Sequence, residues 1–244
     1  MNIDSVRTRG IAALKESMDK RLGVGPGILY RDEMMVDVFH RRTGCEILLV
    51  DTSSTVDTLL DCIKKNGRTL QLFQRGLFEA FIRISEGEKG DIGVNAYIGD
   101  IGNKEFCEAT EEIMAQFRPH DRHTIAIEIV EAPYGEIDGR FIDNAIWLRE
   151  QGFGLAVDDY DLFGDEIDNV SDEILGAVGQ HCTKIKLDWR VTKKLIQQKF
   201  VRRQLLNLRS IHSEKKIVAE GIRTRDDILA LTGIVDNFQI SSYQ

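Results

Sequence analysis

The sequence predicts an α/β protein built as a modified (β/α)8 barrel. Short apolar runs alternate with helical patterns along most of the 244 residues, which is typical of parallel strands joined by helices. Many of these runs end on a polar or charged residue, and such residues recur roughly every 30 positions, about the length of one strand plus one helix. Because the strand ends of a barrel converge on one face, these residues are predicted to share one pocket.

The start of the chain departs from this regular alternation. Residues 1–24 are assigned to an N-terminal helix, with an amphipathic pattern over 5–20 that the sequence GVGPG at 23–27 ends. Residues 28–40 are predicted to form a strand, and RRTG at 41–44 is predicted to turn the chain into a second strand, CEILLVD. A hairpin makes its two strands antiparallel, so the first barrel strand is expected to be antiparallel.

The remaining elements follow in order. Two helices are predicted at 55–65 and 70–84, followed by a strand at 91–98 and a helix at 104–117. The later strands are placed at 124–130, 153–158, 182–187, 215–219 and 234–239, with helices at 138–151, 172–179, 191–209 and 224–231. No linker interrupts the series, so residues 1–244 are expected to form a single domain, in which the final barrel helix is missing.

Composition excludes some classes of protein. The net charge of −8 disfavours binding to a nucleic acid polymer. No apolar run approaches the roughly 20 residues of a membrane span, and the N-terminus lacks the apolar segment of a signal peptide. The four cysteines form no CxxC pair, which favours a reducing, cytoplasmic location over a disulfide framework.

The polar residues at the predicted strand ends are the candidate site. The most telling is Glu128, at the centre of the apolar run AIEIVEA, because a buried carboxylate is costly unless something pairs with it. Oxygen ligands of this kind suit Mg²⁺ or Mn²⁺ and suit zinc poorly. The full set is Glu46, Asn95, Glu128, Asp158, Asp159, Lys186, Glu220 and Gln239.

For each residue alone, a simpler interpretation stays open. An aspartate at a strand end is a common helix cap, and Glu220 could be a carboxylate that a helix dipole favours. Lys186 could be a surface lysine, since Lys184 lies beside it. The series of such residues at barrel spacing favours a shared site instead.

In order and spacing, the motifs GCEILL, VNAYI, IEIVEA, VDDY, KIKLD, VAEGI and FQ resemble the EAL domain, a family of bacterial phosphodiesterases of the signalling nucleotide cyclic di-GMP. The resemblance covers nearly the whole chain. It implies a barrel with an antiparallel first strand, and two Mg²⁺ or Mn²⁺ ions that serve hydrolysis to linear pGpG. It further implies metal ligation by Glu46, Asn95, Glu128, Asp158 and Asp159, with Asp158 bridging, a water held by Lys186, and an inner ring completed by Glu220 and Gln239.

Four positions depart from the family pattern. Val50 stands where the family has a phosphate-binding arginine, and Tyr30-Arg31-Asp32 replaces a segment with a guanine-side glutamine. The loop Asp161–Asp165 is acidic, and Arg223 replaces a glutamate. Losing an arginine–phosphate pair should weaken substrate binding.

A second interpretation is therefore kept. In it, the chain is a catalytically weak or inactive EAL-like domain that acts as a cyclic di-GMP sensor or a protein-interaction module. The resemblance also implies a homodimer, formed through the altered loop, and control by a protein partner or sensory domain.

Overall fold

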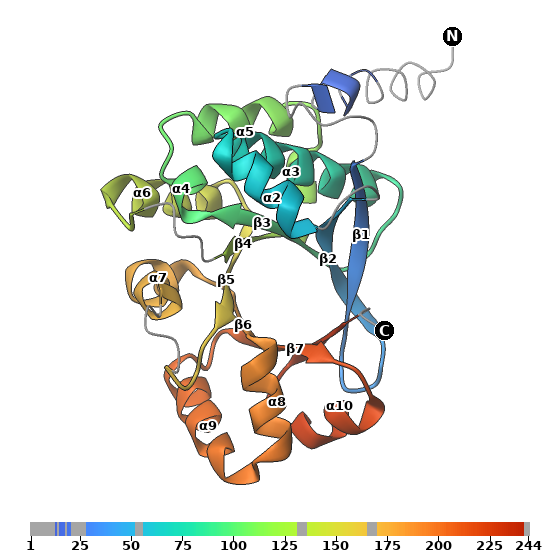
Figure 1. Ribbon diagram of the computed structural model, residues 1–244, viewed down its shortest axis with the longest axis vertical. Helices are drawn as coiled ribbons and strands as arrows, with labels where there is room; N and C mark the ends of the chain where they lie inside the picture. Colours follow the sequence, from blue (N-terminus) through green and yellow to red (C-terminus); the bar gives the residue numbers. More distant parts are fainter. Residues whose placement is uncertain are drawn as a thin grey trace.

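The computed structural model describes residues 13, 15–17, 19–20, 28–51, 56–130, 136–164 and 170–241. The predicted N-terminal helix, 1–24, lies mostly outside these residues. Eight strands close into a barrel in chain order, β1 to β8, with helices packed around the outside (Figure 1). This confirms the predicted fold class.

The first strand is antiparallel to both of its neighbours. β1 (Ile28–Val36) pairs with β2 (Arg42–Asp51) and with β8 (Asn237–Ile240) in antiparallel fashion, whereas all other neighbouring strands are parallel. The tight connection between β1 and β2 dictates this direction, because a short turn can join only antiparallel strands. The other strands are β3 (Asp91–Tyr97), β4 (Ile125–Val130), β5 (Gly154–Tyr160), β6 (Lys184–Leu187) and β7 (Lys216–Ile222).

The helices follow the strands as predicted, apart from the short α4, which was not predicted, and one predicted helix that is broken in two. They are α2 (Val56–Lys65), α3 (Thr69–Ser85), α4 (Ile98–Ile101), α5 (Phe106–Met114), α6 (Gly139–Glu150), α7 (Val170–Val178), α8 (Trp189–Gln197), α9 (Arg202–Ile211) and α10 (Arg225–Leu231). In Figure 1, α2, α3 and α5 lie on one side of the barrel, and α8, α9 and α10 lie on the opposite side.

The helix predicted at 191–209 is two helices. Gln198 has φ −125° and ψ 84°, outside the helical region, and a short 3₁₀ turn joins α8 to α9. The segment 191–209 contains no glycine or proline, so no helix-breaking residue marks the interruption in the sequence.

Side chains alternate between the two faces of the barrel wall. Outward-facing residues such as Val94, Ile127 and Leu155 form one apolar core with the surrounding helices. Inward positions include small residues, such as Ala126 and Ala156, and the polar residues of the candidate site. Among the described residues, the helices are too short or too polar to cross a membrane.

Candidate active site

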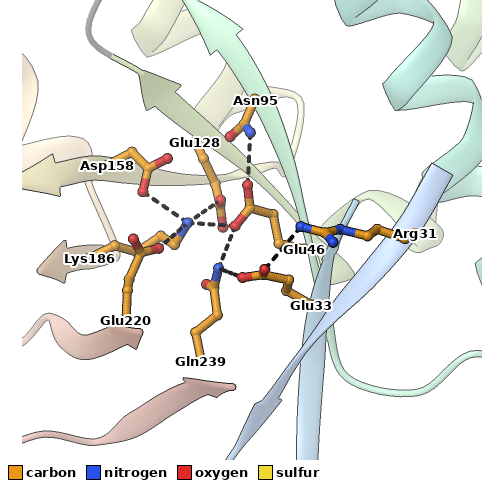
Figure 2. A network of polar contacts seen from close by, with 9 residues as sticks. All are labelled: Arg31, Glu33, Glu46, Asn95, Glu128, Asp158, Lys186, Glu220 and Gln239. Atoms are coloured by element: carbon orange, nitrogen blue, oxygen red, sulfur yellow. Dashed lines mark hydrogen bonds and ion pairs between the residues drawn. The ribbon is translucent and has the colours of Figure 1, made fainter. Parts of the chain in front are cut away.

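The inward-facing polar residues meet inside the barrel around the ammonium group of Lys186. This lysine comes from β6 and is 1% exposed. Figure 2 shows carboxylates from four other strands directed at it. Its Nζ atom lies 2.9 Å from Glu46 Oε2, 2.6 Å from Glu128 Oε2, 2.8 Å from Asp158 Oδ1 and 2.8 Å from Glu220 Oε1. The structure thus brings together these residues from strand ends about 30 residues apart.

Two amide side chains hold Glu46 in place. Asn95 Nδ2 donates to Glu46 Oε1 at 2.8 Å, and Gln239 Nε2 donates to Glu46 Oε2 at 2.7 Å. Because Lys186 also donates to Oε2, both carboxylate oxygens of Glu46 have partners. These contacts fix the Glu46 carboxylate in one orientation in the barrel interior.

A β-bulge in β5 allows two consecutive aspartates to contribute to the site. Adjacent side chains of a regular strand point to opposite faces, but the pairing of β5 with β6 shifts register between Val157 and Tyr160. At this point Asp159 adopts a positive φ of 48°, a conformation that Asp tolerates better than most residues. As a result, carboxylate oxygens of Asp158, Asp159 and Glu220 lie within 4.8 Å of one another.

A similar irregularity follows Glu220 at the end of β7. The β7–β8 register shifts between Ala219 and Ile222, and Gly221 has a φ of 70°. A Cβ atom at Gly221 would lie 2.7 Å from Trp189 Cβ. Glycine is therefore required here both for its backbone conformation and for its contact with the start of α8.

A second glycine leaves room for Glu128. Gly93 of β3 faces the barrel interior, where a Cβ atom would lie 2.2 Å from Glu128 Oε1. Small residues at this level, including Ala126 and Ala156, leave the volume that the long side chains of Glu128 and Lys186 occupy.

Burial and mutual repulsion perturb the pKa values of these carboxylates. Burial raises the pKa of Glu128 to about 8, and the charges of Glu46 and Asp158 act in the same direction. The charge of Asp158 raises the pKa of Asp159 to about 7, and burial adds to this. Burial also raises the pKa of Glu220 well above its ordinary value. The site therefore holds more carboxyl groups than one lysine can neutralise, and several of them hold protons more tightly than free carboxyl groups do.

Glu46 and Lys186 stay ionised in this setting. Burial opposes ionisation of Glu46, but Lys186 and the hydrogen bonds from Asn95 and Gln239 outweigh it and keep its pKa below the ordinary value. Burial likewise opposes the charge on Lys186, but the surrounding carboxylates hold its pKa well above that of a free lysine. The pair forms the charged centre of the site.

The arrangement fits divalent cations. Two groups of carboxylates each offer three oxygens within 4.8 Å of one another, Glu46–Glu128–Asp158 and Asp158–Asp159–Glu220, and Asp158 belongs to both. Among the described residues, Asn95 Oδ1 and Glu128 Oε1 are buried without a hydrogen-bond partner. An all-oxygen donor set with unpaired oxygens and more carboxyl groups than one lysine can neutralise suits Mg²⁺ or Mn²⁺.

Sequence reasoning missed Glu33. This residue of β1 lies opposite Glu46 in the strand register, is 8% exposed, and accepts a hydrogen bond from Gln239 Nε2 at 3.0 Å. Arg31 reaches the same carboxylate at 3.4 Å (Figure 2). The available signal was a run of three charged residues, Arg31, Asp32 and Glu33, in the middle of an otherwise apolar strand.

The other departures from the family pattern lie near the site or outside the described region. The side chain of Val50 and residue Asp165 are not among those described. Asp161 is buried, and its Oδ1 accepts a hydrogen bond from the Phe163 amide at 3.0 Å. Arg223 lines a cavity beside Glu220 at the ends of β7 and β8.

Comparison with known proteins identifies the fold. No protein-family model and no curated protein matches the chain. Among solved structures, the EAL enzyme Bd1971 in its cAMP- and cyclic-di-GMP-bound form has a TM-score of 0.72 at 17% identity, over 96% of this chain and 65% of that one. The chain thus spans slightly less than two thirds of that protein.

Two further structures agree with this result. The PaMucR phosphodiesterase in complex with c-di-GMP has a TM-score of 0.70 at 18% identity, over 94% of each chain. The BlrP1 protein of Klebsiella pneumoniae, in a manganese and cyclic di-GMP complex, has a TM-score of 0.66 at 18% identity, over 88% of this chain and 55% of that one. The protein therefore has the fold of EAL domains, with a first strand antiparallel to its neighbours.

Proposed function

We propose that this protein is a metal-dependent phosphodiesterase that hydrolyses cyclic di-GMP to linear pGpG by a two-metal mechanism. The observation that carries the proposal is the pair of carboxylate groups that share Asp158 and surround Lys186. The EAL-like fold supports the substrate class, because structures with this fold are described as cyclic di-GMP complexes, one of them a phosphodiesterase and another containing manganese.

Six residues would hold the two ions. Glu46, Asn95, Glu128 and Asp158 would hold one, and Asp158, Asp159 and Glu220 offer oxygens for the other. When bound, the ions would activate water and stabilise the charge that develops on the phosphate and the leaving oxygen.

The chain's own residues would orient the reactants. Lys186 carries its charge at the point where the carboxylates converge, so it can hold the attacking water and offset negative charge at phosphorus. Gln239 and Asn95 keep the Glu46 carboxylate oriented through their hydrogen bonds. Glu220 Oε1 lies 2.8 Å from Lys186 Nζ, so it helps to fix the position of that ammonium group.

The alternative function is a domain that binds cyclic di-GMP or a protein partner with little or no turnover. Glu33 favours it, because this carboxylate adds negative charge beside the cluster and engages Arg31. An anionic substrate must approach past that charge. In this case the protein would bind the nucleotide, and the bound nucleotide would stay intact.

The test is incubation of purified protein with cyclic di-GMP and Mn²⁺ or Mg²⁺, with chromatography of the products. We expect pGpG in the presence of metal and none with EDTA. Glu46→Gln should lower the rate by more than about 100-fold, because it removes a proposed ligand, whereas Glu150→Gln on the exposed end of α6 should not. Undiminished turnover in Glu46→Gln would contradict the site assignment, and binding without any product would support the alternative.

A further inference from the structure

Basic residues are concentrated in the segment 189–213, which contains α8, the short 3₁₀ turn Lys199–Val201 and α9. This segment has seven basic residues and no acidic one, a charge of +7 in a chain whose net charge is −8, so the remaining residues carry −15. An acidic protein with one strongly basic segment is suited to present that segment to a negatively charged partner.

The same segment holds most of the large apolar side chains that are exposed to solvent. Among the described residues, seven such side chains are exposed, and four of them lie in this segment, namely Trp189, Phe200, Leu206 and Ile211. Phe200 is 80% exposed and Ile211 is 72% exposed. Single exposed apolar residues are common on protein surfaces, but a group of them within one short segment indicates an interaction site.

The exposed residues of α9 lie on one face of the helix. Leu205 and Leu208 are buried and belong to the apolar core. Arg203, Leu206 and Ile211 are exposed, and their spacings of three and five residues place them together on the side of the helix away from the core. Figure 1 shows α9 at one end of the molecule, outside the barrel wall. The helix therefore carries large apolar side chains on its outer face as well, which is unusual for a surface helix.

Basic side chains without ion-pair partners flank these apolar groups. Lys199 precedes Phe200 in the 3₁₀ turn, and Arg203 lies in the first turn of α9. Both are exposed, and neither forms an ion pair with a described residue. By contrast, Arg209 of the same helix is held by Asp236 at 2.7 Å. The outer face thus combines unpaired positive charge with exposed apolar groups, and the α9 surface is defined as Lys199, Phe200, Arg203, Leu206 and Ile211.

We propose that the α9 surface binds the face of a membrane that contains anionic phospholipids. Its basic side chains would contact lipid phosphate groups, and Phe200, Leu206 and Ile211 would insert beneath the headgroups. A lipid surface fits both features, because it offers negative charge and, about 5–10 Å below, an apolar layer. A nucleic acid would engage the charges and could stack on Phe200, but it has no apolar layer for Leu206 and Ile211. The inference goes beyond nucleotide hydrolysis and concerns a face that the carboxylate cluster does not use.

The two kinds of contact can be separated by experiment. Each basic residue close to an anionic bilayer should strengthen binding about fivefold, and burial of one phenylalanine side chain should strengthen it about tenfold or more. Ionic strength screens the charges and leaves the apolar contacts in place. Binding should therefore need anionic lipid, weaken with salt, and depend on both kinds of residue.

The experiment is cosedimentation of the full chain with vesicles of phosphatidylcholine alone and with vesicles of phosphatidylcholine mixed with phosphatidylglycerol. The wild type should bind the mixed vesicles, and binding should be weaker at about 1 M NaCl than at about 0.1 M. Vesicles of phosphatidylcholine alone should bind little protein. The double variant Lys199→Glu/Arg203→Glu should lose at least about 25-fold in affinity for the mixed vesicles, and Phe200→Ser about tenfold.

Matched variants elsewhere on the surface are the controls. Lys65→Glu/Lys104→Glu makes the same change of charge at two exposed positions, one at the end of α2 and one just before α5. Phe39→Ser removes a phenylalanine that is 73% exposed in the turn between β1 and β2. Both controls should bind the mixed vesicles like the wild type. Circular dichroism of each variant checks that the fold is intact.

Three results would overturn the proposal. The first is a wild type that does not bind the mixed vesicles, or that binds both kinds of vesicle equally. The second is a control that loses as much affinity as its matched variant, because the contact would then not belong to the α9 surface. The third is binding to single-stranded DNA, or a dimer that Phe200→Ser dissociates, in a protein that ignores vesicles. Since pGpG formation plays no part in this assay, failure here leaves the proposed function unaffected.

Discussion

The buried carboxylate of Asp100 allows a prediction about stability that needs no ligand. Its pKa in the folded protein is raised from 3.8 to about 6 by burial. When the pKa of a group is higher in the folded protein than in the unfolded chain, the group stabilises the folded state at pH values below its unfolded-state pKa. This stabilisation is lost as the pH rises through the pKa of the folded state. A shift of about two units corresponds to about 3 kcal/mol at high pH, of which about 2 kcal/mol should be lost between pH 4 and pH 8.

Asp100→Asn removes the titration and keeps an oxygen for the Thr69 hydroxyl. The new amide group also lowers the free energy of unfolding by an amount that does not depend on pH, because its NH₂ group replaces a carboxylate oxygen that lacks a hydrogen-bond partner. The difference in free energy of unfolding, variant minus wild type, should therefore rise by about 2 kcal/mol from pH 4 to pH 8, whatever that constant is. Urea denaturation at several pH values measures it, with Asp143→Asn as the exposed control. A difference that is constant with pH would refute the assignment of a raised pKa to Asp100.

Two further predictions concern the barrel interior. Lys186→Met should lower the free energy of unfolding by about 3–5 kcal/mol at pH 8, because it leaves buried carboxylates without their counter-charge. The loss should shrink at pH 5, where carboxylates with raised pKa values take up protons, and a loss of equal size at both pH values in urea denaturation would contradict this. Gly93→Ala places a methyl group against Glu128 Oε1 and should cost about 1–3 kcal/mol of stability. It should also reduce pGpG formation at least tenfold, and full activity in a folded sample would show that Glu128 can shift without consequence.

Much of the architecture follows from local patterns in the sequence. The alternation of apolar runs and helical segments predicts a barrel, because parallel strands need helical crossovers and the wall buries one apolar face. The short turn after β1 predicts its antiparallel direction. Lys186 and the carboxylates were found from their positions at strand ends, since strands of a barrel present their ends to the same face. The break at Gln198 was not predicted, because no glycine or proline marks it in the sequence.

The tertiary structure decided which of these groups touch. The bulge at Asp158–Asp159 brings both aspartates to the site, although in a regular strand they would face opposite ways. Glu33 joins through the β1–β2 register, and Asp100 and Arg31 line one cavity although they are far apart in the sequence. The residue types and their spacing in the sequence are enough to predict that a strand ends on an acidic residue. Its charge state and its partners depend on the distances across the barrel and on the exclusion of water, which exist only once the sheet has closed.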